Sequence, residues 1–161
     1  MARRVLGVDP GSAATGWALV AADGNRFRLE EAGVVRPRGE TRESRLADLA
    51  NRLDDLLTRL RPDVAAVETP FTGRNPRSAL LLAEARGVIL SRLGTSGVEV
   101  HAYSPAAVKL AVVGHGAAEK EQVAYMVVRL LGLHDTPQAD AADAAAVALT
   151  HLHSTRWHDR R

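Results

Sequence analysis

Residues 3–35 read RRVLGVDPGSAATGWALVAADGNRFRLEEAGVV, in which three runs rich in apolar residues are separated by glycine-containing turns. The turn segments 9–12 (DPGS) and 23–25 (DGN) carry the residue types that favour turns and hairpins. Each apolar run has the length of a short strand. We therefore predict an antiparallel meander of three strands over residues 3–9, 16–22 and 27–35.

The periodicity changes after this stretch. Apolar residues between 43 and 61 recur at i, i+3, i+4 and i+7, which predicts an amphipathic helix that Pro62 ends. Residues 64–68 (VAAVE) are almost wholly apolar, as in a strand that is buried on both faces. The elements predicted after it are a helix at 76–93, a strand at 98–101, and helices at about 105–113, 118–131 and 138–153.

Three antiparallel strands followed by strands that alternate with helices indicate an α/β protein with a mixed sheet. The order βββαβαβα, closed by further helices, is that of the ribonuclease H-like fold, with five strands flanked by helices. We expect residues 1–154 to form one such domain, and residues 155–161 to form a frayed C-terminal tail.

The composition excludes several classes of protein. The 161 residues are 46% hydrophobic and 25% charged, which is typical of a globular chain and not of a disordered one. Cysteine is absent, which excludes disulfides, zinc–thiolate sites and a catalytic thiol. The sequence has no apolar run of about 18 residues and no stretch typical of a secretory signal. We therefore expect a cytoplasmic protein without membrane contact.

Four acidic residues stand out by their placement. Asp9 ends the first predicted strand and Glu68 ends the fourth, whereas Asp140 and Asp143 lie three residues apart near the start of the last helix. Residues at i and i+3 share one helical face, so both carboxylates can reach one point. Oxygen ligands without His or Cys suit Mg²⁺ or Mn²⁺, and a pair of such ions can promote phosphodiester hydrolysis.

Each acid also has an ordinary structural interpretation. An Asp before Pro-Gly commonly forms a turn, and an acid at a strand end is often simply a surface residue. Asp140 and Asp143 could serve only as favourable charges in the first turns of a helix. The combined placement favours a site, because one fold would bring all four side chains together.

The chain resembles the RuvC family of Holliday-junction resolvases from about residue 5 to residue 153. Four motifs occur in family order and at family spacing. They are 7–12 (GVDPGS) with Thr15-Gly16; Glu68, Phe71 and Asn75 with 78–80 and 85–87; Val108-Lys109 with Gly114, Gly116 and Lys120; and 138–144 (QADAADA) leading to Thr150-His151.

The resemblance implies a function. It makes Asp9, Glu68, Asp140 and Asp143 the catalytic metal ligands for two Mg²⁺ (or Mn²⁺) ions. The implied reaction is paired, symmetric nicking of four-way junction DNA in recombination and repair, which leaves 5′-phosphate and 3′-hydroxyl ends. The implied partners are the junction itself, a second copy of the chain in a homodimer, and a branch-migration motor of the RuvA and RuvB type.

Basic and aromatic residues add to this interpretation. The 21 basic residues include only two lysines, Lys109 and Lys120, which match family lysines near the catalytic cluster. A compact ammonium suits a position beside the scissile phosphate, although two chance surface lysines are the alternative. In the family, an aromatic residue at the position of Phe71 probes the junction centre; a core Phe under a loop is the alternative.

Further DNA contacts and a subunit interface are expected near Phe71. The predicted DNA-binding residues there are Arg74, Asn75 and Arg77, which join Phe71, Lys109 and Lys120 in that role.

The helix predicted at 76–93 is apolar on nearly every side, which fits a central helix or a subunit interface. A junction with near two-fold symmetry favours the interface. The six histidines lack metal-ligand spacing and are interpreted as structural or surface residues.

Three other functions compete with this one. A related nuclease of the YqgF kind would act on structured RNA, but the pattern from Phe71 to Gly87 is closer to RuvC. A non-catalytic junction-binding module would not need all four acids. An ATPase of the sugar-kinase class also carries an Asp in a glycine turn, but its fold needs two such halves.

Overall fold

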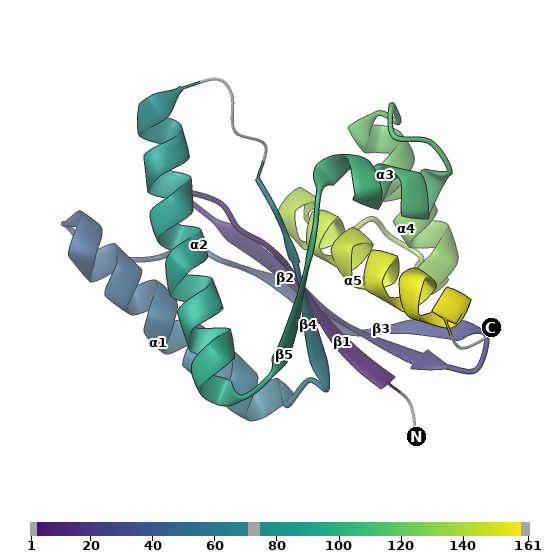
Figure 1. Cartoon of the computed structure of the whole chain (residues 1–161), viewed down its shortest axis with the longest axis horizontal. Coiled ribbons are helices and arrows are strands. Elements are labelled where there is room, and N and C mark those ends of the chain that lie inside the picture. Colours follow the sequence, from purple (N-terminus) through teal and green to yellow (C-terminus); the bar gives the residue numbers. More distant parts are fainter. Residues whose placement is uncertain (1–2, 71–74, 159–161) are drawn as a thin grey trace.

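The computed structural model describes residues 3–70 and 75–158, with side chains described up to residue 155. Within these residues, five strands form one mixed sheet in the order β3-β2-β1-β4-β5 (Figure 1). The strands β1, β2 and β3 are antiparallel neighbours, whereas β4 pairs parallel to both β1 and β5. The predicted ribonuclease H-like sheet is therefore confirmed. The strands are β1 (Arg3–Asp9), β2 (Thr15–Asp23), β3 (Arg26–Val35), β4 (Val64–Glu68) and β5 (Glu99–Tyr103).

Helices cover both faces of the sheet (Figure 1). One face packs against α1 and α2, whose leucines and Ile89 form one apolar cluster with β1, β2 and β4. The other face packs against α5, with α3 and α4 beside it in a second cluster. The helices are α1 (Arg42–Leu60), α2 (Pro76–Ser96), α3 (Pro105–Val113), α4 (Lys120–Leu131) and α5 (Ala139–His158).

The alanine-rich helix α5 lies directly across β1 and β2. Its residues from Ala144 to Leu149 are 0% exposed, so both the sheet and the neighbouring helices enclose this part of the helix. Small side chains allow a helix to approach a sheet closely, and the strands present Gly7 and Gly16 beneath it. The N-terminal turn of α5 consequently lies at the end of the sheet where β1 finishes.

The predicted boundaries of three helices differ from the observed ones by two residues or more. Helix α2 passes through Gly94 and ends at Gly97, whose φ of 78° closes the helix in the left-handed conformation. Helix α4 begins two residues later than predicted because Glu119 and Gln122 form a capping box. Helix α5 continues beyond the predicted end at 153, since the sequence after Pro137 contains no Gly or Pro to stop it.

None of the described helices combines the length and the apolar character that crossing a membrane requires.

Candidate active site

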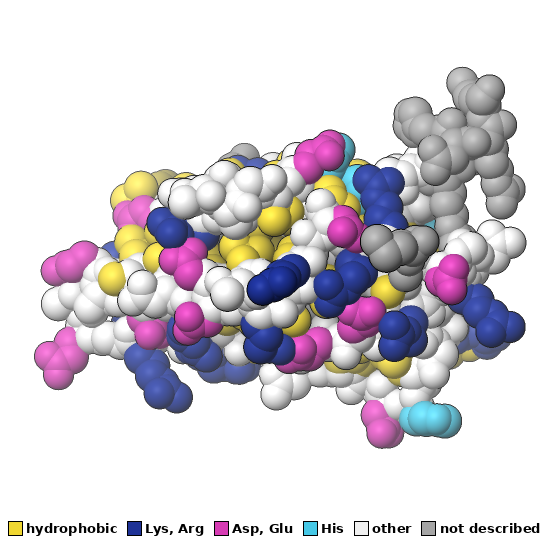
Figure 2. Space-filling model, turned by 90° about the horizontal axis from the view of Figure 1, so that it is seen from below, with side chains coloured by type: hydrophobic (Ala, Val, Ile, Leu, Met, Phe, Trp, Pro, Cys, Tyr) yellow, Lys and Arg dark blue, Asp and Glu magenta, His cyan; other side chains and the backbone are white. Residues whose placement is uncertain are grey.

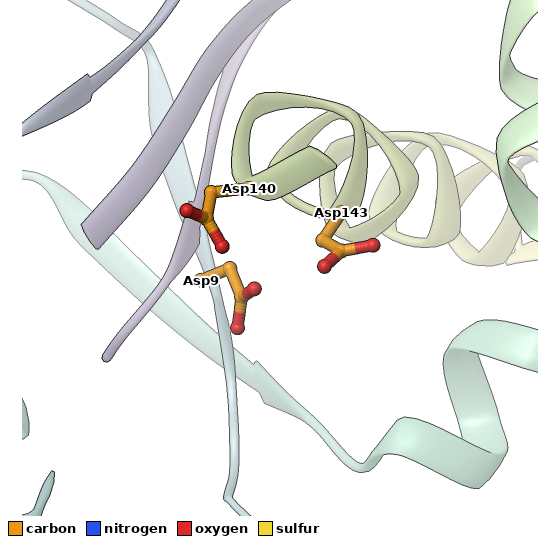
Figure 3. Close-up of side chains that lie close together, drawn as sticks. All are labelled: Asp9, Asp140 and Asp143. Carbon is orange, nitrogen blue, oxygen red and sulfur yellow. The ribbon is translucent and has the colours of Figure 1, made fainter. Parts of the chain in front are cut away.

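Three elements bring acidic side chains to one end of the sheet. Strands β1 and β4 are parallel, with Val8 opposite Val67, so Asp9 and Glu68 leave the sheet side by side. The first turns of α5 supply Asp140 and Asp143. One carboxylate oxygen each from Asp9, Asp140 and Asp143 lies within 4.8 Å of the others, and Figure 3 shows the three side chains around a common space.

Glu68 completes the cluster through its contact with Asp9. Burial, a hydrogen bond with Glu68 and the charges of Glu68, Asp143 and Asp140 together raise the pKa of Asp9 to about 9. Like charges held this close oppose ionisation unless a cation lies among them. The cluster therefore carries an electrostatic penalty that a bound cation would relieve.

Lys120 supplies one positive charge at this cluster. Its Nζ lies 3.0 Å from Oδ2 of Asp143, and this pair raises the pKa of Lys120. Burial raises the pKa of Asp143, and the neighbouring ammonium opposes that rise. Lys120 is the first residue of α4, so the Glu119–Gln122 capping box that fixes this terminus also fixes the position of its Cα atom.

A cavity of about 330 Å³ opens beside the acids. Its charged lining includes Glu68, Asp143, Lys109 and Lys120, so the second predicted lysine lies at the same site as the first. The volume falls within the range of small-ligand pockets, about 300–1,000 Å³. Residues that the sequence analysis did not assign to the site form the rest of the lining: Pro105, Val108, Ala118, Glu119, Val123 and Ala146.

The other predicted DNA contacts lie on or before the start of α2. Asn75 is the N-cap of this helix, and its Oδ1 accepts hydrogen bonds from the backbone N–H groups of Arg77 and Ser78. Arg77 is exposed in the first turn. The cap role of Asn75 therefore uses its side-chain oxygen. Phe71 and Arg74 lie outside the described residues.

The donor set fits a hard divalent cation. Carboxylate oxygens without nitrogen or sulfur ligands are the chemistry that Mg²⁺ and Mn²⁺ prefer. Asp9, Asp140 and Asp143 would hold the ion at their common point, with Glu68 beside Asp9 as a further ligand. A carboxylate cluster that can hold a metal ion therefore lies at one end of a ribonuclease H-like sheet, an arrangement typical of the metal-dependent nucleases of that fold.

Comparison with known proteins gives the family. The family model described as Crossover junction endodeoxyribonuclease RuvC matches residues 5–151. The RuvC of Bordetella parapertussis is 46% identical over 158 residues, which cover 98% of this chain and 87% of that protein. The RuvC of Chloroflexus aggregans is 45% identical, with 94% and 93% covered. The chain therefore belongs to the RuvC family of crossover junction endodeoxyribonucleases, as the sequence motifs predicted.

Solved structures agree with this assignment. The structure of Thermus thermophilus RuvC in complex with a Holliday junction substrate has a TM-score of 0.90 and 38% identity, and the match covers 97% of this chain and 96% of that one. The yeast mitochondrial Holliday junction resolvase has a TM-score of 0.74 at 15% identity, which shows a shared fold.

Proposed function

We propose that this chain resolves four-way DNA junctions by paired, symmetric nicks, with two Mg²⁺ (or Mn²⁺) ions at each active site. The observation that carries the proposal is the convergence of Asp9, Asp140 and Asp143, with Glu68 at Asp9, in a chain that matches a junction-bound RuvC along its length. Family membership makes the chain a nuclease, and the proposal adds its substrate, its ions and its residues.

The acids hold and orient the reacting groups. The acids would hold the two ions, whose chemistry when bound would be to activate a water molecule and to stabilise the leaving oxygen of the phosphodiester. Asp9 lies between Glu68 and the two α5 aspartates, so it is placed to contribute to both sides of the cluster. The nick would leave a 5′-phosphate and a 3′-hydroxyl, the ends that a ligase can join.

The two lysines provide fixed positive charge on the cavity wall. Lys120 contacts Asp143 without a metal, and a phosphate entering the cavity would offer its ammonium a second anion. A charge already held in place stabilises developing negative charge without reorganisation in the transition state. We assign Lys120 this role at the scissile phosphate, and Lys109 a supporting role in the same cavity.

Junction binding would extend from the cavity toward the start of α2. Arg77 is an exposed basic residue there. The proposal assigns DNA contacts to Arg77 and to Asn75, Phe71 and Arg74. A cytoplasmic location and a branch-migration motor of the RuvA and RuvB type belong to the proposal through the family resemblance.

The proposed dimer uses the outer side of α2. Ala85, Ile89 and Leu93 face the protomer's own core, so Ile89, which the apolar pattern alone suggests as an interface residue, is 0% exposed. In contrast, Leu80 is 60% exposed, and its neighbours Leu81 and Leu82 are partly exposed. An isologous dimer through this segment would match the near two-fold symmetry of a four-way junction.

The test compares three substrates. A labelled synthetic four-way junction, a linear duplex and an RNA hairpin are incubated with the protein, with and without Mg²⁺ or Mn²⁺. We expect metal-dependent nicks at symmetric positions of the junction, and little cleavage of the other two. Preferred cleavage of the hairpin would replace the proposal with a structured-RNA nuclease. Tight junction binding without cleavage in either metal would indicate a binding module.

A further inference from the structure

Two glycines lie where the ligand-bearing helix meets the sheet. Gly16 on β2 is paired with Asp9 on β1, and Gly7 lies two residues before Asp9 on the same strand. Since side chains alternate along a strand, Gly7, Asp9 and Gly16 all face α5. The acid on the strand and the two glycines therefore share one small surface beneath the helix.

The contact at Gly16 involves a proposed metal ligand directly. A Cβ atom added to Gly16 would collide with the backbone carbonyl group of Asp140 and lie 3.1 Å from the Cβ of Asp140. A Cβ at Gly7 would collide with the carbonyl of Ala144, and would lie 2.9 Å from the backbone nitrogen of Ala148. Backbone atoms of a buried helix cannot rotate away, so any side chain at these positions displaces the helix itself.

We propose that Gly16 is a positioning residue for the metal site, because its missing side chain sets the depth at which Asp140 and Asp143 approach Asp9. The inference rests on the proposed metal site and concerns what fixes its dimensions. Oxygens within 4.8 Å of one another can share a cation, and this spacing depends on the helix resting against the α-carbon of Gly16. A displacement of about 1 Å in such a constellation can cost on the order of 100-fold in rate.

The same contact accounts for the residue types around it. Asp140 lies in the first turn of α5. Ala141, Ala142 and Ala144 to Ala146, at most 3% exposed, leave little side-chain bulk between the helix and its surroundings. The site therefore combines a short strand-end carboxylate with a helix whose backbone lies directly against Gly7 and Gly16 of the sheet.

Direct metal binding tests the proposal. Calorimetric titration with Mn²⁺ should show an affinity at least 10-fold weaker for Gly16→Ala than for the parent protein. Gly94→Ala is the matched control, because an added Cβ there meets nothing within 4 Å, and it should bind as the parent does. Leu149→Ala controls for stability: it removes packing from the 0%-exposed core of α5 without pushing the helix away, and should lower the melting temperature more than the Mn²⁺ affinity.

A rescue variant separates positioning from loss of structure. Asp140→Glu adds one methylene, so it should restore part of the Mn²⁺ affinity in the Gly16→Ala background and weaken binding in the parent. If Gly16→Ala does not fold, Ala18→Val adds bulk on the same face of β2, at a position that already carries a Cβ atom, and should weaken Mn²⁺ binding in the same direction.

Specific outcomes overturn the inference. Parental Mn²⁺ affinity in folded Gly16→Ala, or in Ala18→Val where the first variant does not fold, would show that Gly16 does not set the site. An equal loss of affinity in Leu149→Ala, or no rescue by Asp140→Glu, would reduce Gly16 to an ordinary packing position. A parent protein that does not bind Mn²⁺ would remove the proposed metal site as well. If the parent binds Mn²⁺ but leaves junctions uncut, only the proposed function fails.

Discussion

Asp9 illustrates the conflict between stability and function at a single residue. Burial and the neighbouring acids raise its pKa to about 9, well above the ordinary value of 3.8. Because the folded-state pKa is raised, the proton on Asp9 stabilises the fold fully at low pH. That stabilisation is lost as the pH rises from about 4 toward 9. In the metal-free protein, the contribution of Asp9 to stability should therefore be smallest at the alkaline pH where the ionised ligands bind cations best.

The first prediction concerns the variant Asp9→Asn. It should abolish metal-dependent cleavage, because one ligand charge is lost, and leave junction binding detectable. In metal-free buffer at pH 8 it should be more stable than the parent by about 0.5–2 kcal/mol, as is common when functional strain is removed. Glu68→Gln, Asp140→Asn and Asp143→Asn should also abolish cleavage.

Its measurements are denaturant unfolding in EDTA and a junction-cleavage assay. Asp55→Asn, an exposed acid on α1, serves as the control and should change neither result. Near-normal cleavage by a variant of any of the four acids would remove that acid from the proposed site.

Lys120 gives a prediction that separates binding from chemistry. Lys120→Ala should slow cleavage by 10-fold or more and weaken junction binding much less, since its proposed role is at the scissile phosphate. Single-turnover rates and a binding titration on the same junction provide the comparison, with Lys109→Ala as the matched lysine variant. Equal losses of rate and affinity for Lys120→Ala would identify Lys120 as an ordinary backbone contact.

His151 is the most buried histidine among the described residues, and is 1% exposed. Its Nδ1 lies 2.8 Å from the Tyr103 hydroxyl oxygen, and its Nε2 has no hydrogen-bond partner. Burial is the main cause that lowers the pKa of His151 to about 4; His101 and Arg3 contribute to the lowering, and Glu99 opposes it. The folded state therefore resists protonation at a position where the unfolded chain accepts a proton.

This arrangement predicts acid sensitivity. With a folded pKa below the unfolded one, the stability due to His151 is complete above pH 6.5 and is lost as the pH falls toward 4. The loss is roughly 3 kcal/mol across that window. His151→Gln should have a lower free energy of unfolding than the parent at pH 7, and that free energy should change less with pH. His134→Gln, at an exposed position, should show the same stability as the parent at each pH. Parallel curves for His151→Gln and the parent would contradict this account.

At the scale of secondary structure, α2 shows what an apolar pattern leaves undecided. The side chains of Ala85, Ile89 and Leu93 are buried within the protomer, whereas the side chain of Leu80 is exposed. Leu80→Glu should therefore convert a dimer into a monomer, without the unfolding that Ile89→Glu would cause. Light scattering during gel filtration measures the result, and Leu110→Glu, 59% exposed on α3, is the matched control. A parent protein that is monomeric at micromolar concentration would contradict the proposed interface.

The sequence predicted elements well where the local signals were strong. Turn residues at 9–12 and 23–25 separate the first three strands, and Ser104 caps a helix that begins with proline. The prediction was wrong where tertiary contacts decide: Tyr103 extends β5 by pairing with Glu68, beyond the strand predicted at 98–101. The four acids could be found because they end elements, whereas the contact between Gly16 and Asp140 joins residues that no local pattern connects.

For the molecule as a whole, charge is distributed and not concentrated. The formal net charge is only +2, and the face in Figure 2 shows basic and acidic side chains interspersed. Many arginines are already paired within the protein, such as Arg4 with Glu30, Arg42 with Glu84 and Arg92 with Asp54. Such pairs leave fewer basic side chains free for phosphate contacts. Junction affinity should therefore depend on a small set of basic side chains near the cavity and on bound metal.

Salt titration of junction binding tests this distribution of charge. Each phosphate contact on duplex DNA contributes a slope of about −0.9 in log affinity against log salt. Arg77→Ala should weaken binding to all junction sequences and flatten the slope by about 1, because the arginine is exposed at the start of α2. Arg59→Ala is the control: its guanidinium is ion-paired with Glu31, so its removal should leave the slope unchanged. If both variants keep the parental slope, the junction is held by a different surface, since the loss of a phosphate contact necessarily reduces the number of counterions released.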